Sequence, residues 1–180
     1  MISPQDIIHF WFEELTNKDW FGKSDELDNL IHKRFENLAE SAAKGELVDW
    51  RKTIEGRLAE IIVLDQFSRN LWRDTPRAFA QDPIALALAQ EALKQPEYES
   101  LPLIKRKFLL MPYMHSESAK IHAQAVELFS TLEDDYTFDY EIRHKEIIDR
   151  FGRYPHRNAI LNRTSTPEEI EFLAQPNSSF

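Results

Sequence analysis

Pairs of a capping residue and a proline recur along the chain, at Ser3-Pro4, Thr75-Pro76, Asp82-Pro83 and Thr166-Pro167. A Ser, Thr or Asp side chain satisfies free backbone N–H groups where a helix begins, and proline fits the first helical turn. No segment alternates apolar and polar residues between turn signals, so strand signals are poor. These features predict an all-α fold.

The same signals predict where the helices run. We expect them over 3–15, 24–43, 53–73, 82–94, 101–111, 116–131, 136–151 and 166–174. Short connections between short helices indicate stacked antiparallel helical hairpins of a tetratricopeptide-like type, forming a single domain over 1–180. The sequence does not show the clean repeat of about 34 residues that is typical of tetratricopeptide arrays, so it does not support the repeat architecture directly.

Composition excludes several classes of protein. The chain has no cysteine and carries a net charge of −9, with 42% hydrophobic residues. Disulfides and thiol catalysis are therefore excluded, and nucleic acid and anionic membranes are disfavoured as partners. We find no signal peptide and no apolar run long enough for a membrane span, so a cytoplasmic location is the default expectation.

The stretch Arg150–Asn158 gathers Arg150, Arg153, His156, Arg157 and Asn158 around a glycine and a proline. Arginine is permanently charged and presents a planar fork of donors, which suits a carboxylate or a phosphate. A local positive island of this kind fits a small anion better than a polymer. The other interpretation is a structural knot in which these arginines bind carboxylates of the chain, and both remain open.

Asp65 falls on the apolar stripe of the helix expected over 53–73, one turn before Arg69. A carboxylate on a core-facing stripe needs a partner, so a structural Asp65–Arg69 pair is expected. The functional alternative is that Asp65 orients Arg69 toward a ligand, with Gln66 adding an amide group.

Three further residues are candidates for proton transfer, namely His115, Glu117 and His144. Ser116 is the expected N-cap of the helix over 116–131, which places Glu117 in the first turn, where the helix dipole favours an acid. His144 lies on an apolar stripe and leads toward the arginine-rich turn. We expect these three residues, with Asp65, Arg69, Arg153 and His156, to line one cleft.

Sites for metals and cofactors are not expected. No His-Glu-x-x-His pair occurs, and arginines near the histidines would repel a cation. The chain also lacks a phosphate-binding glycine loop, a dinucleotide-binding glycine pattern and a serine-nucleophile elbow.

Several of these stretches resemble a known bacterial family, the domain of unknown function 924 family. The resemblance rests chiefly on Leu64–Asn70, Met111–Glu117 and Arg150–Asn158, and it extends over nearly the whole chain. It implies an all-helical, tetratricopeptide-like domain and brings no established activity.

Two functions therefore compete. In the first, the protein binds or processes a small anionic molecule, held by Asp65, Gln66, Arg69 and the residues of Arg150–Asn158, while His115, Glu117 and His144 handle protons. In the second, it is a tetratricopeptide-like interaction module that binds a peptide, and the charged cluster is structural. The sequence does not decide whether the protein is an enzyme.

Overall fold

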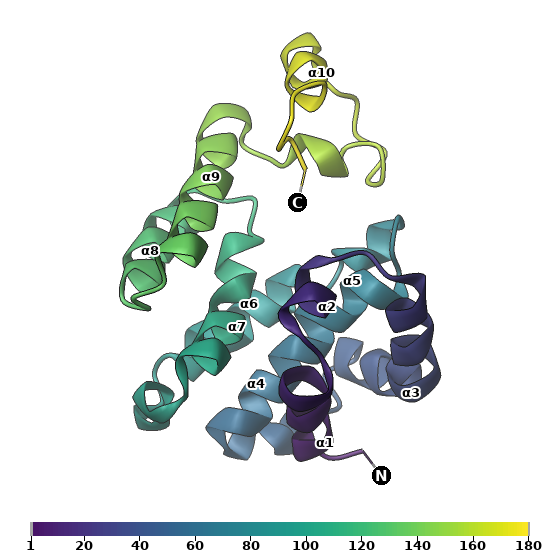
Figure 1. Ribbon diagram of the computed structural model, residues 1–180, viewed down its shortest axis with the longest axis vertical. Coiled ribbons are helices and arrows are strands. Elements are labelled where there is room, and N and C mark those ends of the chain that lie inside the picture. Colours follow the sequence, from purple (N-terminus) through teal and green to yellow (C-terminus); the bar gives the residue numbers. More distant parts are fainter. Residues whose placement is uncertain (1, 180) are drawn as a thin grey trace. The chain divides into compact units, whose positions relative to one another are not determined.

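A computed structural model describes residues 2–179, and helices dominate this range while strands are absent from it (Figure 1). The prediction of an all-α fold is confirmed. The α-helices are α1 (Pro4–His9), α2 (Asn17–Phe21), α3 (Asp25–Ala43), α4 (Ile54–Ile62), α5 (Ser68–Leu71), α6 (Asp82–Ala92), α7 (Leu103–Met114), α8 (Ala119–Ser130), α9 (Asp135–Phe151) and α10 (Pro167–Leu173).

Short 3₁₀ turns connect several of these helices, and two π-helical segments interrupt the helices expected over 3–15 and 53–73. The π-helical segments are η1 (Phe10–Glu14) and η3 (Val63–Phe67). The 3₁₀ turns are η2 (Val48–Lys52), η4 (Pro76–Ala78), η5 (Pro96–Ser100) and η6 (Pro155–Arg157). A π-helical turn accommodates one extra residue, and such turns occur frequently at functional sites.

The chain divides into two compact units. Unit 1 comprises Met1–Arg73 and Arg77–Pro112, and unit 2 comprises Asp74–Pro76 and Tyr113–Phe180. The expected single domain over 1–180 stays a prediction, and residues 1 and 180 lie outside the described range. None of the described helices is long and apolar enough to cross a membrane.

Unit 1 has an aromatic core built where η1 meets α3 (Phe35) and η3 (Phe67). The rings of Phe10 and Phe35 lie 4.9 Å apart, and Phe67 lies 5.1 Å from Phe35 and 5.7 Å from Trp11. All four side chains are buried. Pairs of rings at this spacing add about 1 kcal/mol each to the free energy gained by burial.

Unit 2 is built on the helical hairpin of α8 and α9, which lie side by side (Figure 1). Gly152 ends α9 with a φ of 70°, a left-handed conformation in which a side chain would be strained. The chain can therefore turn sharply there and enter the arginine-rich segment. Thr166 and Glu169 form the expected capping box at the start of α10.

The start of α8 differs from the prediction. Pro112 lies inside α7, which continues to Met114, and the N-cap of α8 is Ser118 rather than Ser116. Ser118 accepts a hydrogen bond from the backbone N–H of Ile121. Glu117 therefore precedes the helix, and the role expected for it in the first helical turn is wrong.

Candidate functional site

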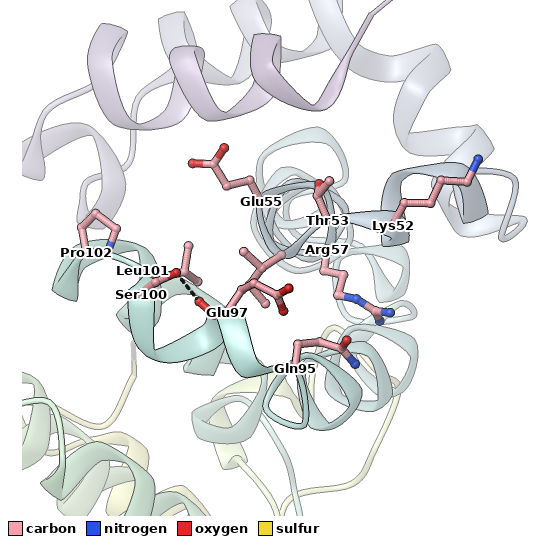
Figure 2. A pocket seen from close by; sticks show the side chains of 10 residues that line it. Lys52, Thr53, Glu55, Arg57, Gln95, Glu97, Ser100, Leu101 and Pro102 are labelled. Carbon is pink, nitrogen blue, oxygen red and sulfur yellow. Dashed lines mark hydrogen bonds between the residues drawn. The ribbon is translucent and has the colours of Figure 1, made fainter.

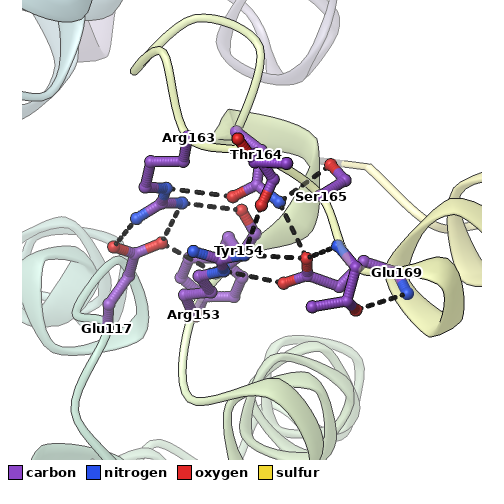
Figure 3. A network of polar contacts seen from close by, with 9 residues as sticks. Glu117, Arg153, Tyr154, Arg163, Thr164, Ser165 and Glu169 are labelled. Atoms are coloured by element: carbon purple, nitrogen blue, oxygen red, sulfur yellow. Dashed lines mark hydrogen bonds and ion pairs between the residues drawn. The ribbon is translucent and has the colours of Figure 1, made fainter.

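The arginine-rich segment of unit 2 forms a network of ion pairs, which we call the clasp (Figure 3). Its members are Glu117, Arg153, Asn158, Arg163 and Glu169. Arg163 donates to both carboxylate oxygens of Glu117, at 2.7 and 2.9 Å, and Arg153 does the same to Glu169, at 2.7 and 2.8 Å. Two-point contacts of this kind are the strongest form of arginine–carboxylate pairing.

Backbone groups and an amide complete the clasp. Asn158 is buried and donates to Glu169 at 3.2 Å, while its side-chain oxygen accepts from Arg163 at 2.9 Å. The backbone N–H of Tyr154 donates to Glu117 at 2.7 Å. The clasp therefore joins three parts of unit 2: the connection before α8, the turn after α9, and α10.

The clasp fixes the ionisation of its two carboxylates. The hydrogen bond from Arg153 is the main cause that lowers the pKa of Glu169 to about 2, and the backbone N–H of Thr166 contributes. Burial alone would raise the pKa of Glu117, but hydrogen bonds from Arg163 and Tyr154 outweigh burial and lower it. Both carboxylates are thus charged at neutral pH.

A second group of side chains surrounds the buried ring of Tyr154, and we call it the Tyr154 cluster. Its imidazoles belong to His122, His144 and His156, with ring centres 6.2, 5.7 and 5.7 Å from that of Tyr154. The guanidinium of Arg157 lies 4.7 Å from the centre of the same ring. Arg157 also donates to the backbone carbonyl of His115 at 3.1 Å, which brings His115 to the edge of the cluster.

His144 is held as a neutral imidazole. Its Nδ1 lies 2.7 Å from the carbonyl oxygen of Tyr140, and because a carbonyl can only accept, Nδ1 carries the hydrogen. Burial, followed by the fields of the neighbouring histidines, lowers the pKa of His144 to about 3. A neutral ring with this tautomer presents Nε2 as an acceptor.

His122 and Glu141 form a buried pair next to this ring. His122 Nδ1 lies 2.7 Å from Glu141, and both side chains have no exposed surface. The Nε2 atom lies 2.8 Å from the carbonyl of Ser116, so it must donate. Burial raises the pKa of Glu141, which favours a protonated carboxyl that donates to Nδ1.

The remaining predicted residues lie in unit 1, where Asp65 has no exposed surface and accepts from Gln66 at 2.5 Å. The expected Asp65–Arg69 contact is confirmed, at 3.4 Å. Arg69 also makes a two-point pair with Asp82, at 2.8 and 3.0 Å. The expectation that these residues share a cleft with those of unit 2 stays a prediction.

Within unit 2, the structure places the predicted residues in three settings. His144, His156 and Arg157 belong to the Tyr154 cluster, with His115 at its edge. Glu117, Arg153 and Asn158 belong to the clasp. Arg150 lies on the surface and pairs with Glu168 at 2.8 Å. Among the described residues, no group of His, Cys, Asp or Glu side chains has the arrangement of a metal site.

Sequence reasoning missed several members of both groups. His122 was not among the candidate residues, yet it belongs to the Tyr154 cluster. Its spacing from the buried Ala125 and Phe129 on α8 is the signal that it faces inward. Arg163, Glu141 and Glu169 were also absent from the candidate set, and their partners are too distant in sequence for a spacing rule to find.

These features define an all-helical protein whose second unit contains an ionic clasp beside a histidine-rich aromatic cluster. The model of the family described as "Bacterial protein of unknown function (DUF924)" matches residues 7–177, and the chain belongs to this family.

One solved structure is similar over nearly its whole length. It is described as "Structure of Protein of Unknown Function ATU0120 from Agrobacterium tumefaciens". The two chains are 36% identical, with a TM-score of 0.89, and the match covers 94% of this chain and 96% of the other. No curated protein matches the sequence.

Proposed function

We propose that the protein binds a small anionic molecule at the Tyr154 cluster of unit 2. One observation carries the proposal: the permanently charged guanidinium of Arg157 and the imidazole of His156 lie beside one buried ring, that of Tyr154. A guanidinium binds carboxylates and phosphates through directed, charge-assisted hydrogen bonds, and an imidazole N–H can add a further donor. His115 and His156 are half-buried and would offer a ligand access from solvent.

The arginines of the clasp are less suited to this task. Arg153 and Arg163 each already hold a carboxylate at two points, so an incoming anion would have to displace Glu169 or Glu117. Breaking such a pair leaves a charge without its partner, which costs several kcal/mol when the pair is buried. We therefore assign these two arginines a structural role and place recognition at the neighbouring cluster.

Binding is better supported than catalysis. A general base works best when its pKa lies close to the working pH. The pKa of His144 is about 3, and Glu117 is held as a charged partner of Arg163. Both groups are therefore poor proton carriers at neutral pH, whereas the guanidinium of Arg157 keeps its charge and donates hydrogen bonds.

The alternative of a peptide-binding module lacks a specific feature in its favour. Large exposed apolar side chains are spread over separate elements, as shown by Phe21 on α2, Val48 on η2, Tyr136 on α9 and Ile170 on α10. A peptide groove needs a contiguous apolar face. The net charge of −9 also supports a small ligand over nucleic acid or a membrane surface, and a cytoplasmic location is part of this proposal.

The proposal is tested by comparing variants of the two groups. Phosphate, sulfate and malonate are each added at the same low millimolar concentration, and the rise in melting temperature is measured for His156→Ala, Arg153→Ala and the wild type. A ligand that binds only the folded state raises the melting temperature by mass action. His9→Ala is the matched control, because His9 is an exposed histidine of unit 1.

At least one anion is expected to raise the melting temperature of the wild type, of His9→Ala and of Arg153→Ala by the same amount. The rise is expected to be much smaller for His156→Ala. Sulfate also stabilises proteins by exclusion from their surface, and this effect would be equal in all variants. An equal rise in all four proteins, or no rise for any anion, would contradict the proposal.

A further inference from the structure

A polar cavity of about 410 Å³ lies in unit 1, at the beginning of α4 (Figure 2). Cavities that bind small molecules commonly measure about 300–1,000 Å³. Arg57 reaches the cavity from α4, and Gln95 and Glu97 reach it from the segment that contains η5. This cavity shares no residue with the clasp or with the Tyr154 cluster.

Arg57 differs from the other arginines of unit 1. Each of the others pairs with a carboxylate: Arg34 with Glu14, Arg51 with Glu60, Arg69 with Asp82, Arg73 with Asp28, Arg77 with Glu40 and Arg106 with Glu99. Within the described part of unit 1, Arg57 has no such partner, although the chain carries 31 acidic residues. A guanidinium that lines a cavity and lacks a partner is available for the anionic group of a ligand.

The carboxylate of Glu97 also lines this cavity and also lacks an ion-pair partner among the described residues. The backbone carbonyl of Glu97 accepts a hydrogen bond from the Ser100 hydroxyl at 2.6 Å. Glu97 and Arg57 line one cavity without pairing with each other. Their two opposite charges are thus separated and both face the same space.

The other charged groups at the cavity already have partners. Glu55 accepts from Lys105 at 2.5 Å and from Gln5 at 3.2 Å, and Lys52 pairs with Asp49 at 2.7 Å. A simple anion would meet repulsion from Glu97, and a simple cation would meet repulsion from Arg57. Only a molecule that carries both charges can satisfy both side chains.

We propose that this cavity binds a small zwitterion of the amino-acid type. The guanidinium of Arg57 would hold the carboxylate through two hydrogen bonds, and the carboxylate of Glu97 would hold the ammonium group. Gln95 also lines the cavity, and while its side-chain nitrogen donates to the carbonyl of Glu91 at 3.2 Å, its side-chain oxygen would accept from the ammonium group.

Nuclear magnetic resonance titration of the full chain tests this inference directly. Glycine, β-alanine and 4-aminobutyrate are the zwitterionic probes, with an increasing separation of the two charges. Acetate and methylammonium are the probes that carry one charge each. At least one zwitterion is expected to shift the backbone amides of 53–57 and 95–101 and to bind more tightly than either single-charge probe.

Substitutions identify the two side chains that bind. Arg57→Gln and Glu97→Gln are each expected to weaken binding of the preferred zwitterion about tenfold, the loss typical of one charged hydrogen-bonding partner. The matched controls are Arg143→Gln and Glu46→Gln, which change exposed side chains elsewhere and are expected to leave binding unchanged. Circular dichroism verifies that every variant remains folded.

Three results would overturn the inference. One is the absence of amide shifts for all three zwitterions up to their solubility limits. Another is equal affinity for acetate and for the best zwitterion. The third is unchanged binding in both Arg57→Gln and Glu97→Gln. None of these results bears on the Tyr154 cluster, so the two proposals fail or survive separately.

Discussion

The aromatic core of unit 1 and the clasp of unit 2 stabilise the chain by different forces. Phe10, Trp11, Phe35 and Phe67 pack ring against ring, and none of them can ionise. One apolar cluster of unit 2 is centred on Ile147, Ile148 and Tyr154, and Phe151 and Phe172 pack against it. There the turn after α9 is joined to α10 by an ion pair of Arg153 with Glu169 and by a hydrogen bond that Asn158 donates to Glu169.

This difference has a physical consequence. Burial of apolar rings depends on the area removed from water and is insensitive to pH. An ion pair with a carboxylate is lost when the carboxylate gains a proton. In unit 1 the loss of ring volume should therefore cost more than the loss of a buried charge, whereas the attachment of α10 in unit 2 should depend on the charge of Glu169.

Phe67→Ala should have the largest effect. The side chain is fully buried and contacts the rings of Phe10, Trp11 and Phe35, so its removal leaves a cavity in the core of unit 1. We expect a loss of about 4 kcal/mol in the free energy of unfolding, measured by urea denaturation. A loss below about 1 kcal/mol would show that the core relaxes to fill the space.

Asp65→Ala should be the next most costly change. The carboxylate accepts from Gln66 and Arg69 and has no exposed surface, so its removal leaves polar groups without their acceptor. We expect a loss of about 3 kcal/mol in the free energy of unfolding. Glu46→Ala is the exposed control and should change it by less than about 0.5 kcal/mol. Equal losses in the two variants would contradict the buried network.

Glu169→Gln isolates the charge of the clasp. Glutamine at this position can still complete the capping box with Thr166, so the main loss is the charged contact with Arg153. We expect the free energy of unfolding to fall by about 2 kcal/mol, and the amides of α10 to exchange faster with solvent hydrogen. Unchanged exchange in α10 would remove the clasp as the contact that holds this helix.

Arg150→Ala should have the smallest effect. Its partner is Glu168, and both side chains are about half exposed, at 48% and 59%. Solvent screens such a pair, so the expected change in the free energy of unfolding is below about 0.5 kcal/mol by chemical denaturation. A loss as large as that of Glu169→Gln would mean that exposed and buried arginine pairs contribute equally.

Sequence patterns predicted the helices better than their interruptions. Ser3, Thr166 and Gly152 occupy the capping positions that their residue types favour, because capping is a local property. The π-helical segments at Phe10–Glu14 and Val63–Phe67 were not predicted. A π-helical turn depends on packing against distant side chains, and the expected helix periodicity does not reveal it.

The candidate site shows the same limit. The buried Asp65 and its pairing with Arg69 were predictable, since four residues separate them on one helical face. The partners of Arg153 and Glu117 were not, because Glu169 and Arg163 reach them through tertiary structure. The sequence therefore revealed a positive segment and left open whether its charges were already neutralised within the chain.

An ionised Glu169 holds α10 to the turn after α9 through its two-point contact with Arg153. Its pKa falls from an ordinary 4.5 to about 2 in the folded protein, so its contribution to stability is present above about pH 4.5 and is lost as pH falls toward 2. Hydrogen exchange of α10 amides, corrected for intrinsic rates, is compared in the wild type and in Glu169→Gln between pH 6 and pH 2. We expect the greater protection of the wild type to be constant down to about pH 4.5 and to disappear near pH 2. Equal protection of both proteins at pH 6, or a difference that persists unchanged at pH 2, would contradict it.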